Sequence, residues 1–156
     1  MAKRRITKVE RERIQKVLDR LGEAYTREYK CYLNHENAWQ LLIATILSAQ
    51  CTDERVNIVT KDLFKVANTP EQMLKLGEEK LKLIIHPCGF YNNKSKAIIE
   101  ASYDIVKKYN GCVPKTLQEL TSLKGVGRKT ANVVISVAFG GQTIAVDTHV
   151  HRVSKR

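Results

Sequence analysis

Two residues near the end of the chain have side chains that can do covalent chemistry on a sugar aldehyde. The first, Lys129, follows a glycine turn and lies in the first turn of an apolar helix. The positive end of a helix dipole disfavours an ammonium there, and the neighbouring Arg128 acts in the same direction. The position therefore favours the neutral amine, which can form a Schiff base with an aldehyde. A lysine that only contacts phosphate is the alternative.

The second residue, Asp147, is predicted to return to the same place. The helix after Lys129 runs for about 12 residues, or ~18 Å, before two glycines end it. Residues 142–146 favour extended backbone, and about six such residues cover ~20 Å. An antiparallel return then brings Asp147 beside Lys129, where a carboxylate can hold the amine, assist deprotonation or stabilise a sugar cation. Asp147 can also cap a helix that starts at Thr148, and the two roles are compatible.

The turn before Lys129 predicts a site for the DNA backbone. Two glycines enclose one apolar residue, cations flank them, and a short helix at 116–122 precedes them. The result is a helix–hairpin–helix at 116–140, whose outward N–H groups at a helix start suit a phosphate oxygen. A non-catalytic DNA-binding module would use this hairpin alone. The predicted DNA contacts here are Lys124, Gly125, Val126, Gly127 and Arg128.

Composition points to the same partner. The 156-residue chain has a formal net charge of +11, which favours a polyanion, with nucleic acid first and a merely basic protein as the alternative. No apolar run approaches ~20 residues, so we expect no membrane span. The basic N-terminus lacks the apolar stretch of a secretory signal. Four widely spaced cysteines indicate reduced thiols, so we expect a cytoplasmic, nucleoid-associated protein.

The hydrophobic pattern predicts an all-α fold, a helix bundle of about eight helices without strands. Residues 38–49 are apolar nearly all round, which predicts the buried centre of the bundle. Capping patterns start helices at Thr7, at Thr52 or Asp53, and at Thr69. The remaining helices are expected at 79–85, 93–109, 116–122 and from the hairpin to residue 139. We divide the chain into an N-terminal helix (1–22), a helical barrel domain (23–140) and the aspartate loop with a further segment (141–156).

Several stretches resemble the endonuclease III family of helix–hairpin–helix DNA glycosylases. They are Gly125-Val-Gly-Arg-Lys-Thr-Ala-Asn-Val-Val134, Thr143-Ile-Ala-Val-Asp-Thr-His-Val150, Leu47-Ser-Ala-Gln-Cys-Thr-Asp53 and Gly89-Phe-Tyr-Asn92. The resemblance implies that Lys129 is the Schiff-base nucleophile and Asp147 the catalytic carboxylate. It also implies that Gln50 fills the gap left by an extruded base and that Phe90 wedges beside the orphaned partner base. From local sequence alone, Gln50 is a turn residue, and a buried position in the core (a core plug) is an equally good interpretation of Phe90.

The implied activity is base-excision repair by a DNA glycosylase with abasic-site (AP) lyase activity, directed at oxidised pyrimidines. Its partner is double-stranded DNA with a damaged base or an abasic site. An inactive remnant that keeps these motifs without the domain that supports them is the further alternative. The sequence differs from the family in three respects. Lys124 stands where proline is usual, and Thr121 stands where an acidic residue is common.

The third difference concerns the family's C-terminal segment. That segment adds helices that pack on the N-terminal helix and usually holds a 4Fe–4S cluster on four closely spaced cysteines. No such spacing occurs here, so we expect a chain truncated before that segment, with no cluster. Ile14, Leu18 and Leu21 would then lose much of their packing surface.

Overall fold

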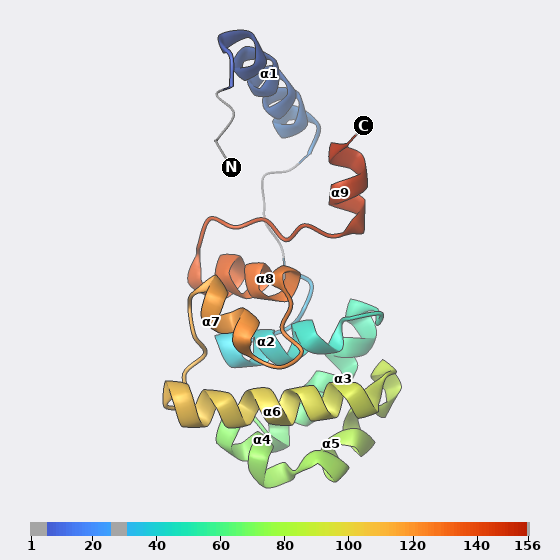
Figure 1. The fold of residues 1–156 in the computed structure, drawn as a ribbon. Coiled ribbons are helices and arrows are strands. Elements are labelled where there is room, and N and C mark those ends of the chain that lie inside the picture. Colours follow the sequence, from blue (N-terminus) through green and yellow to red (C-terminus); the bar gives the residue numbers. More distant parts are fainter. Residues whose placement is uncertain (1–5, 26–30, 156) are drawn as a thin grey trace. The chain divides into compact units, whose positions relative to one another are not determined.

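A computed structural model describes residues 6–25 and 31–155 of the chain (Figure 1). Two compact units are present, Met1–Lys30 and Cys31–Arg156. The described residues form helices and connecting loops, with no strand among them, which confirms the predicted all-α class. None of the described helices is long and apolar enough to cross a membrane.

The first unit contains α1, Lys8–Ala24, which ends two residues beyond the predicted Gly22. Its start is fixed by the predicted capping box: the N–H of Thr7 donates to Glu10 Oε2 at 2.9 Å, and the N–H of Glu10 donates to Thr7 Oγ1 at 3.2 Å. No residue of α1 is buried. Its apolar face remains about half exposed at Ile14, Val17, Leu18 and Leu21.

The core of the second unit is built around α2, Ala38–Leu47. This helix contacts α3 (Asp53–Val66), α6 (Tyr91–Tyr109) and α8 (Arg128–Phe139). Because three helices cover it, its side chains are buried all round, as its uniform apolarity predicted. Figure 1 shows the long helix α6 running across the unit on the side of α2 opposite α8.

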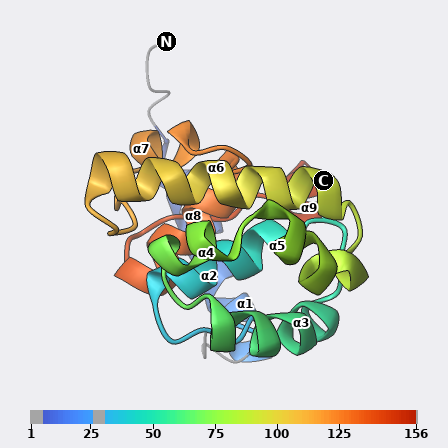
Figure 2. The same ribbon diagram turned by 90° about the horizontal axis from the view of Figure 1, so that it is seen from below.

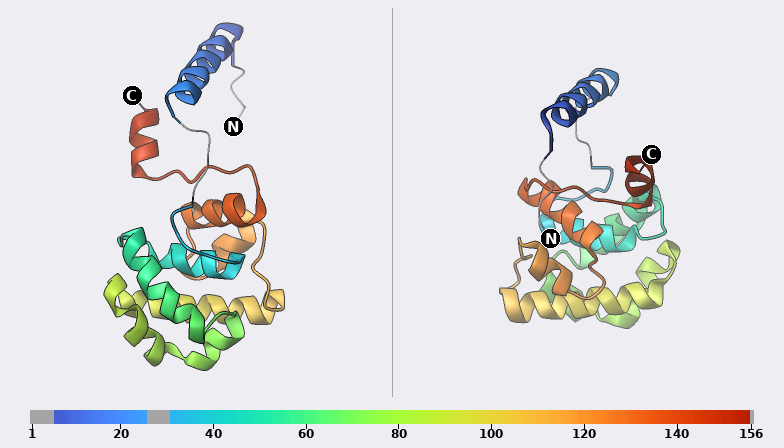
Figure 3. Two further views of the ribbon diagram at one scale, coloured as in Figure 1. Left: turned by 180° about the vertical axis from the view of Figure 1, so that it is seen from behind. Right: turned by 45° about the horizontal axis from the view of Figure 1, so that its top comes forward.

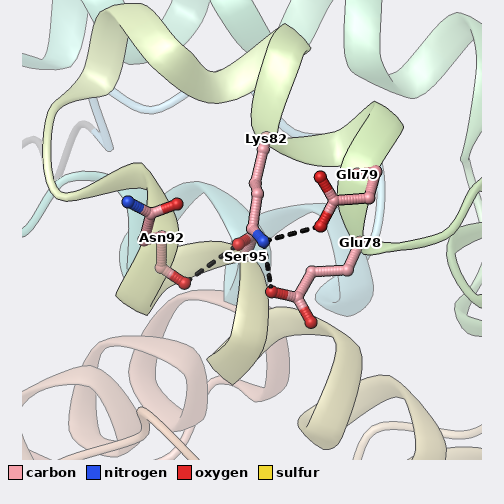
Figure 4. Close-up of polar contacts among 5 residues, drawn as sticks. All are labelled: Glu78, Glu79, Lys82, Asn92 and Ser95. Atoms are coloured by element: carbon pink, nitrogen blue, oxygen red, sulfur yellow. Dashed lines mark hydrogen bonds and ion pairs between the residues drawn. The ribbon is translucent and has the colours of Figure 1, made fainter.

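Two short helices, α4 (Pro70–Leu76) and α5 (Glu78–Ile85), pack against α6 (Figure 2). On α5, Lys82 Nζ lies 2.9 Å from Glu78 Oε1 and 2.8 Å from Glu79 Oε1 (Figure 4). Hydrogen bonds to Glu79 and then Glu78 raise the pKa of Lys82 above its ordinary value. Such solvent-exposed ion pairs contribute little to stability. In the first turn of α6, the buried Ser95 donates its hydroxyl to the carbonyl of Asn92 at 3.0 Å.

The remaining elements carry the predicted chemistry. A short 3₁₀ helix, η1 (His86–Cys88), lies between α5 and the start of α6. Next come α7 (Leu117–Ser122), α8 and α9 (Thr148–Ser154). Residues 140–147 return beside α8 without joining a sheet, so they are a loop stretched between α8 and α9 (Figure 3).

Candidate active site

The structure brings Lys129 and Asp147 together. Lys129 Nζ lies 3.8 Å from Asp147 Oδ2, and the side chains are 58% and 34% exposed. Their separation is at the outer limit of an ion pair, and both groups are open to solvent. The predicted proximity is therefore confirmed, and the amine remains free enough to reach another molecule.

Asn132 fixes the return path that places Asp147. Its side-chain amide donates to the carbonyl of Ile144 at 3.0 Å, and its carbonyl accepts the hydroxyl of Thr143 at 2.7 Å. Two bonds therefore pin the extended segment to α8 shortly before Asp147. The sequence interpretation missed Asn132, although its position three residues after Lys129, on the same helical face, was a usable signal.

The two carboxylate oxygens of Asp147 have different partners. Oδ1 accepts the N–H of Val150 at 2.8 Å, which makes Asp147 the N-cap of α9, and Oδ2 faces Lys129. The hydrogen bond from Val150 first, and the charge of Lys129 second, hold the pKa of Asp147 below its usual 3.8. The group is therefore ionised at neutral pH and rigidly oriented.

The hairpin between α7 and α8 alternates inward and outward residues. Leu123 and Val126 are buried, and Gly125 takes a left-handed φ of +74°. A Cβ on Gly125 would lie 2.7 Å from that of Ala97, so the turn packs tightly against α6. Gly127 is the N-cap of α8 with a φ of −83°, so it does not use the positive φ that is open to glycine.

Of the residues predicted to meet DNA at the hairpin, Lys124, Gly125, Gly127 and Arg128 are exposed. A Cβ on Gly127 would have nothing within 4 Å, so this stretch of backbone borders open space. Val126 is different, because its side chain lies in the core and its N–H donates to the carbonyl of Leu123 at 3.2 Å. Val126 therefore anchors the hairpin to the core.

Gln50 and Phe90 occupy the tips of two strained turns. Gln50 has a φ of +55° and Phe90 a φ of +47°, and neither is glycine. Bulky residues seldom adopt this region, and such strain concentrates at functional sites. Phe90 is 63% exposed, so it is not a core plug. Among the described residues, no hydrogen bond or ion pair joins this pair of turns to Lys129 and Asp147.

The four cysteines do not form a cluster site in the described part of the chain. Cys51 and Cys88 adjoin one another, but Cys112 is exposed and no group of three or more His, Cys, Asp or Glu side chains could hold a metal. Burial first, and the adjoining Cys51 second, raise the pKa of the Cys88 thiol to about 11. The described residues therefore do not fit a four-cysteine iron–sulfur cluster.

Residues 43–156 match the family described as HhH-GPD superfamily base excision DNA repair protein. The chain belongs to this superfamily. It is 50% identical over 145 residues to Endonuclease III of Bacillus subtilis (strain 168), covering 93% of this chain and 66% of that protein. The chain thus spans about two thirds of the length of this relative.

Two solved structures have the same fold. A non-covalent Endonuclease III–DNA complex superposes with a TM-score of 0.86 at 47% identity, covering 97% of this chain and 69% of that one. A trapped Endonuclease III–DNA covalent intermediate, an estranged-adenine complex, gives the same TM-score and identity over 97% and 70%.

Proposed function

We propose that this chain acts on double-stranded DNA as a glycosylase with lyase activity at abasic sites. The observation that carries the proposal is the pairing of Lys129 with Asp147 at 3.8 Å on an exposed surface beside the hairpin. A module that only binds DNA needs neither this pairing nor a carboxylate at the site. The covalent Endonuclease III–DNA intermediate formed by a similar protein supports the same chemistry.

The hairpin would hold the DNA backbone next to the amine. The first N–H groups of a helix lack intrahelical partners, and the helix dipole adds positive potential at that end. At the start of α8 these groups lie beside the exposed Lys124 and Arg128, and the open space at Gly127 leaves room for a phosphate. This arrangement reads no base sequence, as suits an enzyme that searches any duplex.

The reaction then proceeds through Lys129. The amine lone pair attacks C1′ of the extruded nucleotide, and the C1′–N bond breaks, so that the base leaves with the bonding electrons and takes up a proton. The nitrogen then passes one proton to the ring oxygen O4′ as the C1′–O4′ bond breaks, and the opened sugar is held as a protonated Schiff base that keeps one proton on the nitrogen. Removal of a C2′ proton then expels the 3′ phosphate with the electrons of the C3′–O bond. Water hydrolyses the remaining Schiff base and regenerates the amine.

Asp147 contributes as a fixed negative charge. Its low pKa makes it a weak base at neutral pH, but an ionised carboxylate beside C1′ stabilises the cationic character that develops as the base leaves. The capping bond to Val150 holds the carboxylate before substrate arrives, so no reorganisation is needed during the reaction. We assign Asp147 to electrostatic stabilisation of the sugar.

Gln50 and Phe90 would open the duplex. A base must leave the stack before C1′ can be attacked, and this unstacking costs a few kcal/mol. The exposed aromatic ring of Phe90 suits stacking against the orphaned base, and the amide of Gln50 suits the vacated space. We propose oxidised pyrimidines as the damaged bases.

Borohydride trapping tests the proposal. The parent chain and Lys129→Gln would be incubated with a duplex that contains one abasic site, and separately with one that contains thymine glycol. We expect a covalent adduct and strand cleavage with the parent on both duplexes, and neither with Lys129→Gln. An intact parent that binds DNA without any adduct would contradict the enzymatic proposal and favour a binding module.

A further inference from the structure

Lys94 is a buried lysine that the proposed chemistry does not use. It lies in the first half of α6 and is only 6% exposed. Its Nζ donates to two main-chain carbonyls, those of Leu47 and Cys88, each at 2.9 Å. Removing an ammonium from water is unfavourable unless the group is well bonded, so these two contacts fix its position.

The two carbonyls terminate two different elements. Leu47 is the last residue of α2, and Cys88 is the last residue of η1. Carbonyls at a helix end lack intrahelical partners, and the negative end of the helix dipole favours a cation there. Lys94 therefore caps two element ends that lie 41 residues apart in the sequence.

Each capped end leads directly into a strained turn. Gln50 follows Leu47 by three residues, and Phe90 follows Cys88 by two. Both have left-handed backbone, which persists only where the surroundings over-determine it. The single ammonium of Lys94 touches the base of both turns, so it holds one turn at a set distance from the other.

Other contacts secure the η1 side of this junction less directly. Arg55 donates to the carbonyl of Pro87 at 3.5 Å from an exposed position on α3. The rings of His86 and Tyr91 lie 4.5 Å apart and bracket the turn that contains Phe90. Neither contact reaches the carbonyl end of α2. The thiols of Cys51 and Cys88 also adjoin one another between the two segments, but Lys94 bonds to the main chain of both.

We propose that Lys94 is a positioning residue that sets the spacing of Gln50 and Phe90 for entry into the duplex. The inference rests on the proposed function in that these two residues enter the DNA. A packing role alone would be served as well by an apolar side chain, because replacing a buried charge by a well-fitting apolar group is often neutral or stabilising. The ammonium of Lys94 is needed because one group must donate to the carbonyls of both Leu47 and Cys88.

The first test does not depend on DNA chemistry. Amide hydrogen exchange would be followed in the parent and in Lys94→Met at two amides, Cys51, which donates to Ser48, and Gly89, which donates to His86. We expect the variant to accelerate exchange at both amides at least about tenfold more than at Gly77, which donates to Met73 beyond α4. The matched control Lys82→Met removes a lysine of α5 that is 23% exposed and pairs with Glu78 and Glu79, and it should leave all three amides unchanged.

Unchanged exchange at Cys51 and Gly89 would overturn the proposal. Equal acceleration at all three amides would overturn it as well, because release of the two turns must exceed the general loss of stability that the variant also causes.

The second test is a double-mutant cycle on base opening. A duplex with 2-aminopurine opposite an abasic site reports unstacking by its fluorescence. We expect Lys94→Met to weaken the fluorescence-detected opening complex about tenfold, and Gln50→Ala to have little further effect in that background. Borohydride trapping on a single-stranded abasic site, which needs no opening, should be retained by Lys94→Met.

Additive effects of Lys94→Met and Gln50→Ala would overturn the link between these residues while the proposed function stands. A parent chain that neither opens the duplex nor forms an adduct would instead overturn the proposed function, and with it the role of Lys94 in DNA entry. The exchange experiment would still decide whether Lys94 holds the two turns.

Discussion

Two lysines of this chain sit in opposite surroundings. Lys129, at the start of α8, is 58% exposed and stands 3.8 Å from a single carboxylate oxygen. Lys94, within α6, is buried and donates to two carbonyls at 2.9 Å. The first amine can leave its partner and meet a substrate, whereas the second would leave two buried carbonyls unbonded if it moved.

An exposed lysine with one loose partner can react with another molecule, whereas a buried lysine with two short hydrogen bonds holds the segments that it contacts. A lysine ammonium is a compact charge with three donors on a flexible stem, so its surroundings decide its role. The same division recurs in the hairpin, where Gly127 borders open space and Gly125 packs against Ala97.

Asp147→Asn gives the largest expected effect at the open site. Asparagine is as good an N-cap as aspartate, so α9 and the thermal stability should be preserved. The loss of charge beside Lys129 should slow base release about 10²–10³-fold, as removal of an electrostatic stabiliser does. Single-turnover cleavage and the melting temperature measure the two quantities, and a normal rate would contradict the role given to Asp147.

Lys94→Met should give the opposite result at the buried site. Stability should fall by about 3 kcal/mol, because charged hydrogen bonds are lost and two carbonyls are left unpaired. Urea denaturation measures this change, and trapping on a single-stranded abasic site should continue. Lys82→Met is the control and should leave the urea midpoint unchanged, since its partners are on the surface. Equal urea midpoints for Lys94→Met and Lys82→Met would contradict the structural role given to Lys94.

The two hairpin glycines sharpen the contrast within one turn. Gly125→Ala should lower stability by about 1–3 kcal/mol, because φ is +74° and the new methyl meets Ala97. Gly127→Ala should lower stability less, since φ is −83° and no atom lies within 4 Å of the new methyl, so that only the poorer N-capping of alanine remains as a cost. Its DNA affinity at fixed salt should fall severalfold, because the methyl would obstruct a phosphate at the helix start. Fluorescence anisotropy measures this affinity.

The smallest expected effect is a pH dependence at the buried junction. The pKa of the Cys88 thiol is raised from 9.0 to about 11, so the folded state retains a proton that the unfolded state releases first. The associated stability is present below pH 9 and is lost as the pH rises toward 11. Urea midpoints of the parent and Cys88→Ala measure it, and their difference should shrink over this window. A constant difference would contradict the prediction.

Much of this arrangement could be predicted from local patterns. Caps at Thr7, Thr52 and Thr69 start three helices where expected, because hydroxyl caps act over three residues. Asp147 was expected beside Lys129 because a helix and an extended return of equal length bring their ends together. Both inferences rest on distances along one segment of chain.

The residues that were missed depend on contacts between segments. Lys94 lies on the inward face of α6 with Ala97, Ile98 and Ala101, and helical periodicity agrees with its burial. The sequence pattern does not show which carbonyls Lys94 binds. The pattern also does not show that, of the two hairpin glycines, Gly125 takes the positive φ and packs against Ala97, whereas Gly127 does not.

The position of the trapped adduct shows whether Lys129, and not the buried Lys94, is the reacting amine. The parent chain would be reduced with borohydride on an abasic duplex, digested and mapped by mass spectrometry. We predict a single modified peptide that carries the sugar remnant on Lys129. An adduct on another amine, or an intact folded chain with no adduct, would contradict the account.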